Sequence, residues 1–132
     1  MKNVFISLLI GIAFFSACSR TVNNEPQASV SDFVEVRAKN PSAIVIDVRT
    51  PSEFNAGTME GAININVLED SFEGKVKDFD KDATVMVFCK LGGRSARAKQ
   101  KLVELGFTKV VDLEGGITDW KKAGGKVIVP QQ

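Results

Sequence analysis

The sequence contains no histidine among its 132 residues. This absence excludes a cysteine nucleophile served by a histidine base, as in papain-like proteases, and it excludes most zinc sites, which rely on imidazole ligands. Cysteine itself occurs only twice. A cysteine nucleophile in this chain would therefore depend on backbone amides, a helix terminus and nearby cations for its activation.

An excess of charge of either sign is also missing. Lys and Arg together number 17, Asp and Glu number 16, and the formal net charge is +1. Residues 1–17 contain one charged side chain, Lys2, so the remainder carries 16 basic and 16 acidic residues. A balanced surface gives no basis for expecting a nucleic-acid partner or binding to an anionic membrane surface. The length supports one hydrophobic core, and the sequence shows no internal repeat.

The longest apolar run, residues 4–15, is shorter than the roughly 20 residues that a membrane-spanning helix requires. Its position at the amino terminus, followed by small residues, predicts a secretory signal peptide over residues 1–17. The segment 15–18 resembles a bacterial lipobox, although Phe15 replaces the usual leucine. We therefore expect Cys18 to be lipidated. Ordinary signal cleavage next to it, which gives a soluble secreted protein, is the alternative.

These features divide the chain into a signal peptide over residues 1–17, a lipidated cysteine with a flexible tether over 18–29, and a domain over 30–132. Export places the domain outside the cytoplasm, in the periplasm or at the cell surface, anchored to a bacterial membrane by the lipid. With Cys18 lipidated, Cys89 has no disulfide partner in an oxidising compartment. A lone thiol retained in such a compartment indicates that the thiol takes part in a reaction.

Short apolar runs alternate with helical patterns along the domain. The runs that predict β-strands are 43–46, 62–65, 84–88 and 110–111, and the third is the most apolar and is predicted to be central. The predicted helices are one capped by Ser31, one capped by Thr50, a weak one within 68–79, and two at 95–105 and 117–123. This alternation is typical of an α/β fold with a mainly parallel sheet.

The segment 89–95 connects the most apolar strand to the clearest helix. A loop in this place directs backbone N–H groups and the positive end of the helix dipole to one point, where the Cys89 thiolate is favoured. The loop also holds two cations and two glycines that allow positive φ angles: Lys90, Arg94, Gly92 and Gly93. Its spacing allows the Arg94 guanidinium to return over the sulfur. The alternative is a buried, inert cysteine at a strand end.

Polar residues follow two of the predicted strands. Asp47 comes directly after the run 43–46, as Cys89 comes directly after 84–88. Since the carboxyl ends of parallel strands meet at one edge of the sheet, where ligands bind in such folds, we expect both side chains at a common rim. Thr50 and Glu53, just beyond the first of these strands, have the spacing of a helix capping box.

The loop Cys89-Lys90-Leu91-Gly92-Gly93-Arg94-Ser95 resembles the Cys-x-x-Gly-x-Arg-Ser active loop of single-domain rhodaneses, the thiosulfate and persulfide sulfurtransferases. Tyrosine phosphatases and their relatives have one more residue between the cysteine and the arginine, which makes room for a phosphate. The shorter loop suits a sulfane sulfur. A cysteine-dependent phosphatase is therefore the weaker alternative.

Three further blocks resemble the rhodanese pattern and occur in the right order: 47–54, 57–64, and 113–117 with Trp120. The resemblance covers nearly the whole chain after residue 29 and implies a three-layer α/β domain, with helices on both faces of the mainly parallel sheet. Thr58 departs from the pattern, because the family usually has histidine there. We expect an altered local hydrogen bond at Thr58 and retained activity. Trp120 is interpreted as a core aromatic residue.

The resemblance also implies a division of roles within the site. Cys89 is the expected nucleophile, and the residues expected to bind substrate are Lys90, Leu91, Gly92, Gly93, Arg94 and Ser95. Asp47 and Arg49 are expected to form a structural ion pair near the loop, with Glu53 in a supporting role. No metal and no organic cofactor is implied. The expected partners are small sulfur donors and thiol acceptors, and the expected oligomeric state is a monomer.

The sequence thus predicts a sulfurtransferase that moves a sulfane sulfur from thiosulfate or a persulfide to a thiophilic acceptor through a Cys89 persulfide. The alternative from another class is a rhodanese-like module that carries persulfide or binds a partner protein without turnover. Such modules usually lack the cysteine, so the presence of Cys89 with Arg94 favours the enzyme. The sequence identifies neither the physiological donor nor the acceptor.

Overall fold

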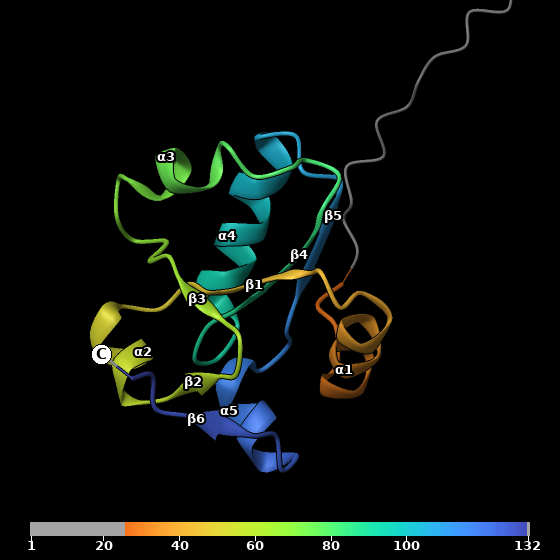
Figure 1. Cartoon of the computed structure of the whole chain (residues 1–132), viewed down its shortest axis with the longest axis vertical. Coiled ribbons are helices and arrows are strands. Elements are labelled where there is room, and N and C mark those ends of the chain that lie inside the picture. The colour runs from red at the N-terminus through yellow and green to blue at the C-terminus, as the bar shows by residue number, and fades with distance from the viewer. Residues whose placement is uncertain (1–25, 132) are drawn as a thin grey trace, which may run out of the picture.

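A computed structural model describes residues 26–131 of the chain. Helices and strands alternate along it, except that two short strands follow one another between the second and third helices (Figure 1). In chain order the elements are α1 (Val30–Lys39), β1 (Ile44–Asp47), α2 (Pro51–Ala56), β2 (Thr58–Met59), β3 (Ile63–Asn64), α3 (Phe72–Val76), β4 (Thr84–Phe88), α4 (Gly93–Glu104), β5 (Lys109–Asp112), α5 (Gly116–Lys122) and β6 (Val127–Ile128). The predictions that concern residues 1–25, including the lipidation of Cys18, lie outside the described residues.

The main sheet has the strand order β3-β1-β4-β5, and every neighbouring pair is parallel. The predicted central strand is confirmed, because β4 lies between β1 and β5. Strand β1 pairs with β4 from Ile44 opposite Val85 to Asp47 opposite Phe88, so the two strands end together. The expectation of a common rim for Asp47 and the residue after β4 follows from this register.

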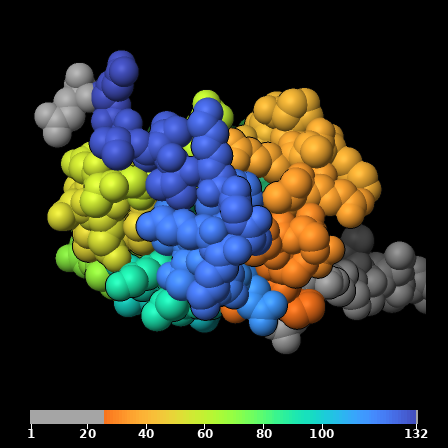
Figure 2. All heavy atoms as spheres, turned by 90° about the horizontal axis from the view of Figure 1, so that it is seen from below, coloured from red at the N-terminus to blue at the C-terminus, as the bar shows by residue number. Residues whose placement is uncertain are grey.

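Two hydrophobic cores lie on opposite faces of this sheet, as expected for a strand covered on both sides. Successive residues of β4 alternate between them. Val85 and Val87 pack with α3 and α4, while Met86 and Phe88 pack with α1 and α5. Figure 2 shows α5 and the carboxyl-terminal segment, in blue, lying between the yellow α2 region and the orange α1. The three-layer architecture predicted from the sequence is confirmed.

A small antiparallel sheet of β2 and β6 was not predicted. Each of its strands has only two residues, which is too short to produce an alternating pattern in the sequence. Thr58 pairs with Ile128, and Met59 pairs with Val127. This pairing fixes the carboxyl-terminal segment beside the turn that follows α2.

Helix boundaries agree with the sequence in the middle of the chain and differ at its start. Thr50 caps α2 with a complete capping box to Glu53, as predicted. The predicted cap Ser31 is wrong, because α1 begins at Val30 and the Ser29 hydroxyl accepts the hydrogen bond from the Asp32 N–H at 3.2 Å. Ser31 therefore lies within the first turn of α1.

The segment before α1 is attached to the sheet rather than free. Ala28 bridges Leu113 in parallel, and its N–H donates to the Asp112 carbonyl at 2.7 Å. The Ala28 carbonyl accepts a hydrogen bond from the Glu114 N–H at 2.8 Å. Ala28, near the end of the segment predicted as a flexible tether, is therefore hydrogen-bonded to the chain at the end of β5. Over residues 26–131, no helix has the length and apolar character to cross a membrane.

Candidate active site

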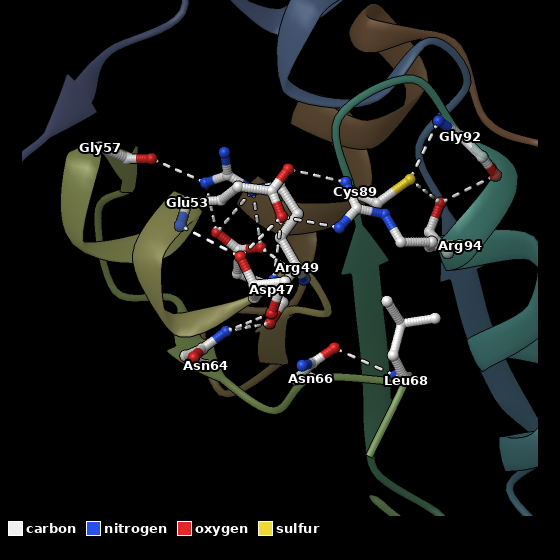
Figure 3. Close-up of polar contacts among 12 residues, drawn as sticks. Asp47, Arg49, Glu53, Gly57, Asn64, Asn66, Leu68, Cys89, Gly92 and Arg94 are labelled. Carbon is white, nitrogen blue, oxygen red and sulfur yellow. Dashed lines mark hydrogen bonds and ion pairs between the residues drawn. The ribbon is translucent and has the colours of Figure 1, made fainter.

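Cys89 is the first residue after β4, and only 1% of its surface is exposed. Its thiol is free of any disulfide. The loop turns back over the sulfur, so that the Gly92 N–H donates to Cys89 Sγ at 3.0 Å (Figure 3). The Ser95 hydroxyl lies 3.4 Å from the same sulfur and donates to the Gly92 carbonyl at 3.1 Å. The loop therefore surrounds the sulfur with hydrogen-bonding groups.

These groups decide the ionisation of the thiol. Burial opposes ionisation of Cys89, but hydrogen bonds from the Ser95 side chain and from backbone N–H groups outweigh burial and lower the pKa of the thiol. The backbone N–H groups belong to Ser95, Gly92 and Leu91. The thiolate, which is the nucleophilic form, is thus favoured without a histidine.

Two glycines let the backbone approach this closely. Gly92, the cap residue of α4, has φ +109°, which favours glycine. Gly116 has φ +57°, and a Cβ atom there would lie 2.4 Å from the Cys89 carbonyl oxygen. Of the two loop glycines that allow a positive φ, Gly93 does not adopt one, because this residue already belongs to the first turn of α4. Sequence reasoning did not identify Gly116 as a support of the loop.

The first turn of α5 holds the base of the loop. The Ile117 N–H donates to the Cys89 carbonyl at 2.8 Å, and the Thr118 N–H donates to the Lys90 carbonyl at 3.2 Å. Because these donors would otherwise be unsatisfied at the helix start, the loop and α5 satisfy each other's backbone groups. This contact explains why a side chain at Gly116 has no room.

Arg94 and Glu53 form a two-pronged ion pair at the front of the loop. Arg94 donates to Glu53 with N···O distances of 2.7 and 2.8 Å. Hydrogen bonds from Arg94 lower the pKa of Glu53 to about 2, against the opposing effect of burial, and hydrogen bonds to Glu53 raise the pKa of Arg94. The spacing of the loop allowed the guanidinium to return over the sulfur. In the structure it is directed to Glu53, and its charge also interacts favourably with Cys89.

Asp47 and Arg49 form a buried ion pair behind α2. The Arg49 guanidinium contacts Asp47 Oδ2 at 2.6 Å and donates to the Gly57 carbonyl at 2.7 Å. Thr58 Oγ1 donates to Asp47 Oδ2 at 2.8 Å. This is the hydrogen bond at the position where the family pattern has histidine. Both carboxylate oxygens of Asp47 thus accept hydrogen bonds from neighbouring protein groups. We infer that this cluster has a structural role and holds the segment that carries Glu53 in place.

The remaining loop side chains face outward. Lys90 and Gly93 are exposed, and 67% of the Leu91 surface is accessible. Trp120 lies in the core against Phe33, with its indole N–H donating to the Lys126 carbonyl at 2.9 Å. An incoming molecule therefore meets the exposed residues of the loop and Arg94 before it reaches the sulfur.

Two residues of the loop's surroundings were missed by sequence reasoning. The Gln27 side chain donates to the Gly92 carbonyl at 3.0 Å and to Asp112 Oδ2 at 2.6 Å. Gln27 belongs to the segment interpreted as a plain tether, and no local pattern marks it. Asp112 does have a signal, since it is a polar residue at the carboxyl end of a strand. Among residues 26–131, no group of three or more Cys, Asp or Glu side chains is placed to hold a metal ion.

The family assignment follows from comparison with known proteins. A family model described as a rhodanese-like domain matches residues 30–123. The chain belongs to the rhodanese-like domain family. Its structure resembles that of a rhodanese-related protein from Thermoplasma volcanium, with a TM-score of 0.69 and 33% sequence identity, over 80% of this chain and 100% of that chain.

Curated relatives of this rhodanese-like chain include named sulfurtransferases. Thiosulfate sulfurtransferase 16, chloroplastic, from Arabidopsis thaliana is 37% identical over 89 residues, which cover 60% of this chain and 74% of the relative. Thiosulfate sulfurtransferase GlpE from Shewanella oneidensis is 33% identical over 95 residues, covering 72% and 91%. Homology to these proteins supports a sulfurtransferase of the rhodanese type.

Proposed function

We propose that this rhodanese-like chain transfers a sulfane sulfur from thiosulfate or a persulfide donor to a thiophilic acceptor through a persulfide on Cys89. The main support for the proposal is the environment of Cys89 Sγ, which is buried at the end of β4 and accepts a hydrogen bond from the Gly92 N–H at 3.0 Å. The same donors that favour the thiolate also favour the negative charge of a persulfide.

In the first half-reaction the Cys89 thiolate attacks the outer sulfur of thiosulfate. A bond forms between the two sulfur atoms, the S–S bond of thiosulfate breaks, and sulfite leaves with the electron pair. Arg94 and the exposed Lys90 supply positive charge on the path of the anionic donor. A persulfide donor follows the same course and releases a thiolate.

In the second half-reaction the acceptor takes the terminal sulfur. Cyanide attacks that sulfur, the bond to Cys89 breaks, and the thiolate returns with the electron pair as thiocyanate leaves. A small thiol is an equivalent acceptor. Because the two half-reactions share one covalent intermediate, we expect ping-pong kinetics.

Intact-mass spectrometry of the full chain carrying Cys18→Ser tests the covalent step. We expect thiosulfate to add the mass of one sulfur atom and cyanide to remove it, and we expect the additional Cys89→Ser variant to gain nothing. A free, alkylatable Cys89 that gains no sulfur from thiosulfate or from persulfide donors would contradict the proposal. Sulfur uptake that requires a protein partner would instead identify a carrier.

We also propose that the chain is exported and anchored by lipid at Cys18. Support comes from the apolar run at 4–15 and from the lipobox-like segment ending at Cys18, both in the sequence alone. Labelling of cells with a radioactive fatty acid tests the anchor. We expect label in the wild-type chain and none in Cys18→Ala, whereas an unlabelled wild-type chain would contradict the anchor.

A further inference from the structure

The segment that precedes α1 contacts the sulfur loop, although it lies outside the match to the family model, which begins at residue 30. Its backbone is fixed at the end of β5. The Ala28 N–H donates to the Asp112 carbonyl at 2.7 Å, and the Ala28 carbonyl accepts a hydrogen bond from the Glu114 N–H at 2.8 Å. These contacts place the side chain of the preceding residue, Gln27, at the back of the loop.

The Gln27 side chain bridges the loop and the sheet. Its Nε2 donates to the Gly92 carbonyl at 3.0 Å and to Asp112 Oδ2 at 2.6 Å. A primary amide has two N–H protons, so each of these acceptors can take one. The approach is close, because a Cβ atom on Gly92 would lie 3.2 Å from Gln27 Nε2. Gln27 thus uses both of its side-chain protons to connect the loop to the end of β5.

Asp112 determines which end of the Gln27 amide faces the loop. Asp112 is the last residue of β5, and only 1% of its surface is exposed. A reversed amide would direct Gln27 Oε1 at the carboxylate and at the Gly92 carbonyl, and two acceptor oxygens form no hydrogen bond with each other. The carboxylate therefore favours the orientation in which Gln27 donates to Gly92.

Gly92 is the residue whose N–H donates to Cys89 Sγ at 3.0 Å, and its carbonyl oxygen points away from that sulfur (Figure 3). The carbonyl accepts three hydrogen bonds, from Gln27 Nε2 at 3.0 Å, from the Ser95 hydroxyl at 3.1 Å and from the Ala96 N–H at 3.1 Å. Ser95 and Ala96 belong to α4, whereas Gln27 comes from outside the loop and its helix. Gln27 therefore fixes Gly92 relative to the sheet that holds Cys89.

We infer that Gln27 is a positioning residue of the sulfur site, which holds the Gly92 carbonyl so that the Gly92 N–H stays on the Cys89 sulfur. Gln27 touches neither the sulfur nor the path of a donor, and it acts through Gly92. A residue before the family domain thus completes the support of the nucleophile.

The inference rests on the proposed function in one respect, that the Cys89 thiolate is the form that reacts. Its test measures the thiol directly, with no sulfur donor present. Failure of sulfur transfer would therefore leave the role of Gln27 standing, and loss of that role would leave the covalent step standing.

A substitution of similar length tests the role in the full chain carrying Cys18→Ser. Gln27→Met removes both side-chain donors, and we expect the apparent pKa of Cys89, followed by thiolate absorbance at 240 nm, to rise. We expect alkylation by iodoacetamide at pH 7 to become about twofold slower, because Ser95 and Ala96 still donate to the Gly92 carbonyl. Gln100→Met, at an exposed position of α4, is the matched control.

A Ser95→Ala background makes the test sharper. Ser95 supplies the other side-chain hydrogen bond to the Gly92 carbonyl, so Gln27 bears more of the positioning when Ser95 is absent. We expect the effect of Gln27→Met on alkylation to grow from about twofold to about fivefold, the effect of losing one modest hydrogen bond. An effect of the same size in both backgrounds would mean that Gln27 does not act through this carbonyl, and the inference would be overturned.

The thiolate titration separates positioning from a merely structural role. If Gln27→Met lowers the unfolding free energy while the apparent pKa of Cys89 stays at the wild-type value, then Gln27 only attaches the segment before α1, and the inference is wrong. Nitrogen-15 relaxation of the Gln27 side-chain amide in the otherwise unchanged chain needs no Gln27 variant. We expect an order parameter close to that of the backbone, and a value as low as that of the exposed Gln100 would also overturn the inference.

Discussion

Two carboxylates border the sulfur loop, and their surroundings are opposite. Glu53 stands at the front in a two-pronged ion pair with Arg94, partly open to solvent, and its pKa is lowered to about 2. Asp112 stands at the back, buried, with a neutral glutamine as its hydrogen-bond donor, and its pKa is raised. One fold therefore lowers the pKa of one carboxyl and raises the pKa of the other.

The difference indicates what each side contributes. At the front, a fixed pair of charges orients Arg94 beside the entrance that an anionic donor uses. At the back, Asp112 accepts a hydrogen bond from the neutral Gln27 side chain, and burial raises the pKa of the carboxyl more than the charge of Lys99 lowers it.

The largest effect is expected from a substitution that displaces the whole sulfur loop and so disturbs both its front and its back. Gly116→Ala places a Cβ atom 2.4 to 2.7 Å from backbone atoms of Cys89 and Lys90, at a φ of +57°. We expect the unfolding free energy to fall by about 3 kcal/mol, from left-handed strain and from displacement of the loop. Urea denaturation measures the change.

Gly93→Ala is the matched control for this substitution. A Cβ atom at Gly93 meets nothing within 4 Å, and the residue lies in the first turn of α4. We expect little change in stability there. If Gly116→Ala proves as mild as Gly93→Ala, then the contact between α5 and the loop does not support the site.

The next largest effect concerns the front alone. Arg94→Ala leaves Glu53 unpaired and removes positive charge from the entrance, and we expect kcat/KM for thiosulfate to fall about hundredfold. Arg94→Lys keeps the charge without the two-pronged contact and should recover part of the loss. Arg97→Ala, which removes an exposed arginine one turn along α4, is the control. Steady-state kinetics with cyanide as acceptor measure the change. Equal losses of kcat/KM in Arg94→Ala and Arg97→Ala would show that the position of the charge is unimportant.

The residues at the front of the sulfur loop were largely predictable from the sequence, whereas the contacts at its back were not. The capping box from Thr50 to Glu53 is a local pattern, and the run 84–88 matches β4 residue for residue. Cys89 and Asp47 at strand ends follow from the topology of parallel sheets. These features depend on neighbours in sequence or on a general rule of the fold.

The back of the loop depends on contacts between residues far apart in sequence. Gln27 and Asp112 are 85 positions apart, and no local pattern connects them. The close approach of Gly116 to Cys89 is likewise a tertiary contact. The ion pair of Arg94 with Glu53 was not predicted for a related reason, because it depends on where α2 packs. The sequence alone does not show which residues of different helices and strands come into contact in the fold.

The pH dependence of stability sharpens the comparison further. Because the folded-state pKa of Glu53 is lowered, its contribution is present above its unfolded pKa near 4.5 and is lost as the pH falls towards about 2. We expect this contribution to be about 1 to 2 kcal/mol after allowance for solvent screening. Glu53→Gln should remove it at neutral pH, as measured by urea denaturation across the acid range.

The contribution of Asp112 to stability changes with pH in the opposite direction. Its folded-state pKa is raised, so its contribution is present below its unfolded pKa and is lost as the pH rises through the raised value. Asp112→Asn should therefore gain stability relative to the wild type as the pH rises, while Glu53→Gln loses it relative to the wild type. Parallel curves for the two variants would refute the contrast between the carboxylates.

The smallest expected effect comes from the residue that connects the back of the loop to the amino-terminal segment. Gln27→Ala removes donors to the Gly92 carbonyl and to Asp112 Oδ2, but Ser95 still donates to Gly92. We expect the unfolding free energy to fall by about 1 kcal/mol, and alkylation of Cys89 to change by about twofold, because one hydrogen bond to each acceptor is lost. Gln100→Ala, on the exposed side of α4, is the control. If the two variants behave alike, the segment before α1 is merely attached to the sheet; if they differ, it also sets the position of the carboxylate behind the sulfur.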